Sequence, residues 1–461
     1  MESKMNRSVS PLRNNAAILA ILTVLIMTVL DVTVMNVALP IMAADFSISD
    51  SQTVWIVTIY QMAIVMLLLP VSSYGDIFSY KRTFLFGVFV FTIASIGCAA
   101  SDSFLMIVLS RGLQGIGGAC IMGVNIALMR LIYPKEILGR GMALNAMVIA
   151  VSTAAGPTLA GAILSIASWH WLFLINIPLG ILAFVLGKRL LPENPASDRE
   201  QSYDWKSALC NMIFFGSLFF AIGGLSSSAT IMRSLILGLM AIFTGIYYIR
   251  RQRNKVHPLL PLDLCRIPLF SLSLCTSVCS FVAQIVAMIS LPFLFITYCG
   301  FSEVTTGLLM TPWPIATMLM SPVAARLAEK FNPGIIASMG MAIFFSGLTA
   351  LSLLTFNSAP YSEWDIVWRM VICGIGFGMY QTPNNLVMVT ATPIERTGGA
   401  GGLQSTARLV GQTFGASLVT LIFAYHKGIS SVRTTLFTAV GFAVIATIVS
   451  STRASRVNPN N

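Results

Sequence analysis

Charged residues are scarce in this chain: Asp, Glu, Lys and Arg make up 10% of its 461 residues. Soluble domains carry about 25% charged residues, so this sequence has too little charge to cover a soluble surface. Hydrophobic residues make up 56% of the chain, and its 24 Met, 28 Phe and 35 Gly are spread over the whole length. This composition excludes a soluble enzyme, a disordered protein and a secreted disulfide scaffold. It indicates a polytopic helical membrane protein.

Motifs for metal, disulfide and nucleotide chemistry are also absent from the sequence. The eight cysteines form no CxxC pair and have no histidine nearby at zinc-ligand spacing, which argues against a metal site or a disulfide framework. A Gly-x4-Gly-Lys-Ser/Thr loop, which would hold the phosphates of ATP, does not occur. We therefore expect no metal, no cofactor and no catalytic residue.

Apolar runs long enough to cross a bilayer, about 20 residues each, occur fourteen times. None of the connecting segments is long enough for a separate soluble domain. The predicted spans are residues 16–40, 53–74, 83–101, 105–129, 138–166, 169–190, 205–226, 230–250, 268–298, 304–326, 334–356, 365–391, 400–424 and 432–452.

The net charge of +11 comes from basic residues that gather on one side of these spans. With the N-terminus inside, 22 of the 28 Lys and Arg lie in inner tails and loops, three lie in outer loops and three lie within spans. Because Lys and Arg favour cytoplasmic loops, we predict a multi-pass protein of the cell inner membrane with both termini in the cytoplasm. Basic residues that set the topology thus account for the positive charge, and we expect the lipid bilayer, not a nucleic acid, as a partner.

The chain repeats itself at an offset of about half its length, as parallel repeats of secondary transporters do. Asp76, Lys81 and Arg82 follow the second span, and Glu329 and Lys330 follow the tenth. An arginine followed by two spaced glycines occurs in the fourth span and again in the twelfth. We predict two six-helix bundles, residues 1–190 and 257–461, with two inserted transmembrane helices in residues 191–256.

Four strings on these spans resemble one family, the 14-span drug:proton antiporters of the major facilitator superfamily. The strings are residues 30–40 (LDVTVMNVALP) in the first span, 111–118 (RGLQGIGG) in the fourth, 156–161 (GPTLAG) in the fifth and 168–178 (SWHWLFLINIP) at the start of the sixth. The resemblance implies the major facilitator fold and a monomer that exchanges protons for a small-molecule substrate.

The loop between the second and third spans departs from the family pattern. Ser72 and Ser79 stand where the family has glycine, and Ile77 and Tyr80 stand where arginine is usual. Asp76, Lys81 and Arg82 match the pattern, and the resemblance implies that they belong to an inner gate. Asp76 could cap a neighbouring helix start or pair with Lys81 or Arg82; the alternative is a solvated loop charge.

Asp31 is the one carboxylate that the predicted spans place deep in the membrane. A charge at the bilayer centre costs at least about 2.5 kcal/mol on insertion scales, so a carboxylate there is a functional hypothesis by default. Such an acid can hold a proton in one state and an organic cation in the other. The alternative is an acid that pairs permanently with an arginine and packs helices together.

Arg111 is the predicted partner of Asp31. Asp31 lies nine residues from Pro40 and Arg111 lies six residues into its span, which at about 1.5 Å per residue gives depths of about 13 Å and about 9 Å. These heights are compatible with a direct contact. Arg111 could instead bond backbone carbonyls and hold two spans together.

Further polar and aromatic residues could line a substrate cavity, although each could equally serve helix packing or membrane anchoring. Aromatic rings would attract a cation, and flexible thioethers suit varied ligands. The candidates are Thr28, Met35, Trp55, Tyr60, Gln61, Gln114, Asn145, Trp313, Tyr380, Gln381, Asn384 and Asn385. Gly156 and Pro157 are predicted, from the family, to form an outer seal against leak; the alternative is a tolerated helix kink.

The sequence therefore predicts a proton-driven exporter of lipophilic, cationic compounds that works by alternating access. An exporter of a neutral or anionic metabolite on the same fold is the nearest alternative. A membrane enzyme would need a metal cluster or a paired acid site, and a receptor would need an effector domain or a long binding loop.

Overall fold

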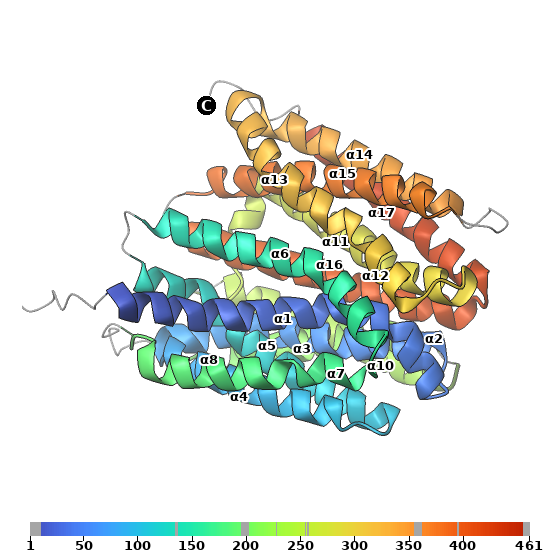
Figure 1. Ribbon diagram of the computed structural model, residues 1–461. Coiled ribbons are helices and arrows are strands. Elements are labelled where there is room, and N and C mark those ends of the chain that lie inside the picture. Colours follow the sequence, from blue (N-terminus) through green and yellow to red (C-terminus); the bar gives the residue numbers. More distant parts are fainter. Residues whose placement is uncertain are drawn as a thin grey trace, which may run out of the picture.

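A computed structural model describes residues 11–133, 137–194, 202–226, 228–253, 255, 258–354, 362–393 and 396–454. Within these residues every regular secondary-structure element is a helix, and no strand occurs. Figure 1 shows long helices running roughly along one direction, as expected when every backbone polar group must be satisfied inside a bilayer.

The first half of the chain forms eight helices, and two further long helices follow. These are α1 (Pro11–Asp45), α2 (Asp50–Thr53), α3 (Trp55–Ile77), α4 (Tyr80–Ala99), α5 (Phe104–Ile132), α6 (Leu138–Leu164), α7 (His170–Leu174), α8 (Asn176–Leu190), α9 (Trp205–Gly224) and α10 (Ile231–Arg253). A short 3₁₀ turn, η1 (Ser228–Thr230), precedes α10.

The second half begins with the 3₁₀ turn η2 (Leu264–Arg266) and continues as helices. They are α11 (Pro268–Pro292), the π-helix η3 (Phe293–Tyr298), α12 (Glu303–Met310), α13 (Pro312–Lys330), α14 (Pro333–Leu353), α15 (Glu363–Thr390), α16 (Thr397–Tyr425) and α17 (Ile429–Ala454).

Every predicted span coincides with one helix or with two consecutive helices. In the described residues, thirteen helical segments are long and apolar enough to cross a bilayer. The remaining predicted span is α15, which has 28 residues but carries the polar stretch 380–385 (YQTPNN) in its second half. The protein is thus an all-helical membrane protein with thirteen to fourteen candidate spans.

The two halves of the chain use the same helix pairings. In the first half, α5 packs against α3 and α4, and α1 packs against α6 and α8. In the second half, α15 packs against α13 and α14, and α11 packs against α16 and α17. Helix α9, one of the two helices predicted as an insertion, contacts α3 and α16, whereas α10 packs against α9 and leaves most of its apolar face exposed.

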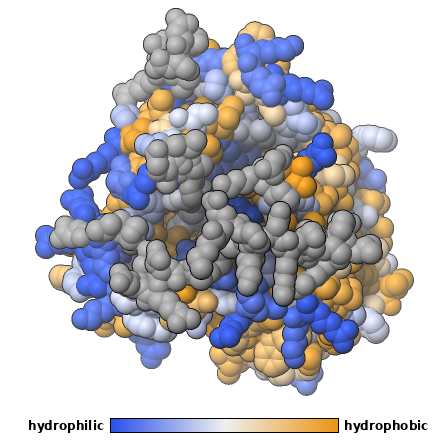
Figure 2. Space-filling model, turned by 90° about the vertical axis from the view of Figure 1, so that its left-hand side faces the viewer, coloured by the Kyte–Doolittle hydropathy of each residue, from blue (hydrophilic) through white to orange (hydrophobic). Residues whose placement is uncertain are grey.

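The halves meet most closely at the end of the molecule that holds α2, α7 and α12, which we call the distal end (Figure 1). Here the Thr158 and Thr311 hydroxyls lie 2.6 Å apart, and the Ser51 hydroxyl donates to the Thr420 carbonyl at 2.7 Å. Figure 1 shows α13 and α14 inclined to α1 and α8, so that the halves diverge toward the opposite, proximal end. Figure 2 shows hydrophilic side chains gathered over that proximal end.

Candidate functional site

Asp31 is the only buried carboxylate in the described part of the chain, with 4% of the residue exposed. Its Oδ2 accepts from Arg111 Nη1 at 2.5 Å, and its Oδ1 accepts from Gln114 Nε2 at 2.9 Å and from Asn176 Nδ2 at 3.1 Å. These donors come from α5 and α8, which both contact α1. The carboxylate is therefore enclosed by the first half alone, and both of its oxygens are occupied.

Arg111 is fully buried and performs both roles that the sequence left open. Besides its ion pair with Asp31, its Nε donates to the Ile56 carbonyl of α3 at 3.2 Å. Its guanidinium also lies 4.2 Å from the centre of the Tyr60 ring, within cation–π range. Arg111 thus links α5 to α1 and α3 at once.

Gln114 and Tyr60 belong to the same cluster, although the sequence proposed them as cavity residues. Gln114 Oε1 accepts from Arg111 at 2.6 Å and its Nε2 also donates to Ser95 Oγ of α4 at 3.0 Å. Gln61, on the neighbouring position of α3, is buried with neither side-chain polar atom hydrogen-bonded. Five helices of the first half therefore contribute to this polar cluster: α1, α3, α4, α5 and α8.

The remaining cavity candidates of the first half have contacts within the protein. Trp55 stacks on Phe220 at 5.9 Å, so it lies at the contact between α3 and α9. Asn145 accepts a hydrogen bond from Asn125 at 3.1 Å. Thr28 bonds its own helix backbone, and Met35 is buried in a hydrophobic core shared by both halves.

In the second half, Tyr380 and Asn384 of α15 form a second polar cluster with serines of α11. The Tyr380 hydroxyl lies 3.0 Å from Ser280 Oγ, and Asn384 donates to Ser277 Oγ at 2.9 Å. Trp313 is buried with its Nε1 lacking a hydrogen-bond partner, and its ring meets Phe344 edge-on. Gln381 and Asn385 are half-buried neighbours on α15.

Arg453 completes this second cluster and was missed by sequence reasoning. The predicted last span ended at residue 452, which put Arg453 in the tail, but in the structure it is fully buried in the last turn of α17. It donates to Asn384 Oδ1, to Ser273 Oγ at 3.0 Å and to Ser450 Oγ at 3.0 Å. The signal in the sequence is the run of Ser273, Ser277 and Ser280, which lie on one side of a helix.

The loop between α3 and α4 uses partners that the sequence did not indicate. The Asp76 carboxylate accepts from the Tyr80 hydroxyl at 2.8 Å, whereas Lys81 pairs with Glu193 at 3.2 Å and Arg82 is exposed. The Ser79 hydroxyl caps α4 by accepting from the Arg82 backbone N–H. The residues that depart from the family pattern, Ser79 and Tyr80, thus hold this loop in place.

Gly156 and Pro157 lie where α6 meets α1 and α12. A side chain at Gly156 would collide with Thr33 of α1, and one at Gly307 of α12 would collide with the Pro157 carbonyl. A Cβ at Gly161 would lie 2.5 Å from the Glu303 carbonyl oxygen, again in α12. Backbone therefore packs directly against backbone between the two halves at the distal end.

The other two arginines within spans differ from each other. Arg369 pairs with Asp365 one turn earlier on α15 at 2.8 Å, a partner that the sequence analysis did not assign. Arg408 of α16 is half-buried and has no ion pair or hydrogen bond with the described residues.

Comparison with known proteins agrees with this architecture. The model of the Major Facilitator Superfamily matches residues 21–416. The chain is 48% identical over 419 residues to the uncharacterized transporter YebQ of Escherichia coli (strain K12), with 91% of each chain covered. It is 26% identical to the riboflavin transporter RibZ of Clostridioides difficile (strain 630), covering 84% of this chain and 83% of RibZ.

A multidrug resistance protein and a solved transporter structure are also similar to this chain. The multidrug resistance protein Stp of Mycobacterium tuberculosis (strain CDC 1551 / Oshkosh) is 25% identical, with 84% of this chain and 72% of Stp covered. A crystal structure of an inward-facing bacterial homologue of the human lysosomal transporter Spinster matches with a TM-score of 0.69 and 16% identity, over 97% of this chain and 98% of that chain. The family match over most of the sequence, on a fold of paired helix halves, establishes that this chain belongs to the Major Facilitator Superfamily and is a membrane transporter, not an enzyme.

Proposed function

We propose that this transporter is a proton-coupled antiporter that exports lipophilic, cationic compounds by alternating access, as a monomer in the cell inner membrane. The observation that supports this proposal is the enclosed Asp31 carboxylate, which accepts hydrogen bonds from one arginine and two side-chain amides. A buried acid of this kind in a membrane is characteristic of a proton relay. The energy source in this proposal is the proton gradient.

Protonation of Asp31 would change how the helices of the first half pack against one another. A neutral Asp31 no longer attracts Arg111, which leaves the guanidinium with the Ile56 carbonyl, Gln114 and the Tyr60 ring. Thr33 lies two residues further along α1 and touches Gly156, so a shift of α1 reaches the distal contact between α6 and α12. Asp31 would thus couple its charge to the opening of the distal end.

In this scheme, substrate and proton do not compete for the same atom. Each of them favours a different conformation of the transporter. The Asp31 side chain has no free oxygen in this conformation, so a substrate between the halves does not touch it. Substrate would bind between the proposed halves, residues 1–190 and 257–461, and favour the state with ionised Asp31. Asp76, Lys81 and Arg82 would belong to the gate at the proximal end.

An exporter of a neutral or anionic metabolite is the second candidate. Arg408 on α16, a helix that contacts both halves, has no acidic partner among the described residues. One of the relatives is a riboflavin transporter. A guanidinium of this kind would suit a substrate with carbonyl or anionic oxygens.

A reconstituted transport assay separates the two candidates. The full-length protein is placed in liposomes with an imposed pH gradient, and matched cationic, neutral and anionic fluorescent compounds are screened while proton flux is recorded. We expect gradient-driven movement of cations with proton flow in the opposite direction. Movement of anionic or neutral compounds alone would support the second candidate, and substrate movement without proton flux would refute antiport.

A further inference from the structure

A pocket lies at the proximal end of the inserted helices, away from the Asp31 cluster. It is formed where α10 ends, by the segment that leads into α11 and by the residue that precedes α16. Its volume is about 500 Å³. The lining residues include Ile249, Gln252, Arg253, Pro258, Arg266 and Arg396.

The pocket wall is strongly basic. The lining includes four basic residues, Arg253, Lys255, Arg266 and Arg396, and only one acidic residue, Asp263. Asp263 is engaged by Arg396 at 2.5 Å, and Lys255 pairs with Asp204 at the start of α9. Arg253 and Arg266 are exposed and have no acidic partner among the described residues. Two guanidinium groups therefore remain available to an anion.

Gln252 provides a second, independent observation. It is 2% exposed, and its Oε1 accepts from the Leu259 backbone N–H at 2.8 Å. Its Nε2 is buried and has no hydrogen-bond partner. A buried N–H donor without a partner costs free energy, and an anionic oxygen in the pocket would satisfy it.

The pocket lining also includes apolar side chains, and one of them is exposed on the outer surface of α10. Ile249, Pro258 and Leu262 line the pocket, and Ile249 is 40% exposed on the same helix as the exposed Ile242 and Ile246. A free phosphate ion would make no favourable contact with these apolar side chains. A phospholipid fits both kinds of lining, because its acyl chains would lie along α10 while its phosphate meets the arginines.

We propose that this pocket binds the phosphate headgroup of an anionic phospholipid. The lipid would connect the end of α10 to Arg396, the residue that precedes α16. Since α16 contacts α3, α9 and α11, the bound lipid would stabilise the inserted helices against the second half. The proposal depends on the membrane location of the chain and is independent of its substrate.

Thermal unfolding of the purified full-length protein tests this proposal. The melting temperature is followed while phosphatidylglycerol, phosphatidylcholine or soluble glycerol 3-phosphate is added. We expect phosphatidylglycerol alone to raise the melting temperature. The double variant Arg253→Gln/Arg266→Gln should need roughly tenfold to thirtyfold more phosphatidylglycerol for the same effect, because two basic contacts near the membrane surface are lost.

The control is the double variant Arg326→Gln/Lys330→Gln, which removes two exposed charges from the end of α13 at the same proximal end. It should respond to phosphatidylglycerol like the unchanged protein. All substituted residues are exposed, and equal melting temperatures in phosphatidylcholine would show that folding is intact. Equal losses of response in both double variants would overturn the site, and an equal effect of glycerol 3-phosphate would overturn the lipid as its ligand.

Discussion

At Asp31 a single charge is held by three polar side chains from two neighbouring helices, α5 and α8. The Arg111 ion pair neutralises it, and the amides of Gln114 and Asn176 complete its hydrogen bonds. Removing one member of a buried pair leaves the other charge uncompensated, which typically costs about 3–5 kcal/mol. The substitution Asp31→Asn keeps the shape of the side chain and removes its charge, so it isolates the effect of the charge.

We predict that Asp31→Asn inserts into the membrane but loses proton-coupled transport of cations. The amide imitates the protonated acid permanently, so its residual substrate binding should become nearly independent of pH. Uphill transport on a pH gradient, measured in proteoliposomes, should fall to the level of empty liposomes. Transport by Asp31→Asn at the rate of the unchanged protein would refute this mechanism and direct attention to Asp76 or Glu303.

Asp204 serves as the matched control, because it is an ion-paired acid outside the spans. Burial alone would raise the pKa of Asp204, but hydrogen bonds from Lys255, Ser207 and Arg251 hold it well below its usual range. Its stabilising effect is therefore fully present above the unfolded pKa of about 4. This effect is lost only as the pH falls through the lower folded pKa.

We predict that Asp204→Asn lowers the free energy of unfolding by about 1 kcal/mol or less, as expected for a partly exposed ion pair. Asn preserves the cap of α9, so the loss reflects the pairs with Arg251 and Lys255. Thermal unfolding should show the same loss at pH 5 and at pH 8, and the pH dependence of transport should not change. A loss that vanishes at pH 5 would contradict the assigned pKa direction.

At the scale of elements, α6 and α12 approach so closely that their backbones touch. Gly161 and Gly307 allow this approach, since a Cβ on either would meet a carbonyl oxygen of the other helix. Small residues allow such packing between membrane helices. The contact joins the two halves at the distal end, where Thr158 and Thr311 also bond.

We predict that Gly161→Ala weakens the distal seal and increases passive leak of accumulated substrate from proteoliposomes. Its Cβ would lie 2.5 Å from the Glu303 carbonyl oxygen, so α12 must move away. Gly139→Ala on the same helix is the control, because nothing lies within 4 Å of its Cβ position. The control should leave the leak unchanged, and equal leak in both variants would mean that the α6–α12 contact is not a seal.

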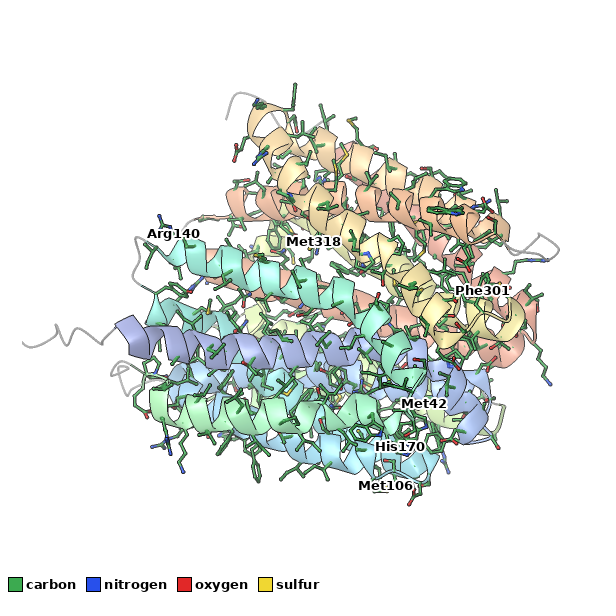
Figure 3. All side chains as sticks on the ribbon, in the orientation of Figure 1. Met42, Met106, Arg140, His170, Phe301 and Met318 are labelled. Atoms are coloured by element: carbon green, nitrogen blue, oxygen red, sulfur yellow. The ribbon has the colours of Figure 1, made fainter. Side chains whose placement is uncertain are left out.

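At the scale of the whole molecule, the two ends differ in the Lys and Arg content of their loops. Figure 3 places Arg140, in the first turn of α6, at the proximal end, whereas Met42, His170 and Phe301 lie at the distal end. The loops assigned to the cytoplasm by their Lys and Arg content are thus those of the proximal end. Our prediction that both termini lie in the cytoplasm rests on this asymmetry.

We predict that reporter fusions at the 188–206 loop and at the C-terminus are active in the cytoplasm and silent outside it. An even number of spans requires both termini on one side. The loop between α4 and α5, residues 100–103, should report the opposite side. Activity of the C-terminal fusion outside the cytoplasm would exclude fourteen spans with a cytoplasmic N-terminus.

The sequence by itself determined the helical class, the positions of the spans and the heights of Asp31 and Arg111. These depend on local hydropathy and on rise per residue, which neighbouring helices do not alter. Only the tertiary structure decided that Asn176 donates a hydrogen bond to Asp31 and that the Tyr80 hydroxyl donates one to Asp76. The same is true of the burial of Arg453 against Asn384. Each of these contacts joins residues on different helices or in different loops. Which faces of two helices meet depends on packing across the whole bundle, and hydropathy carries too little information to specify it.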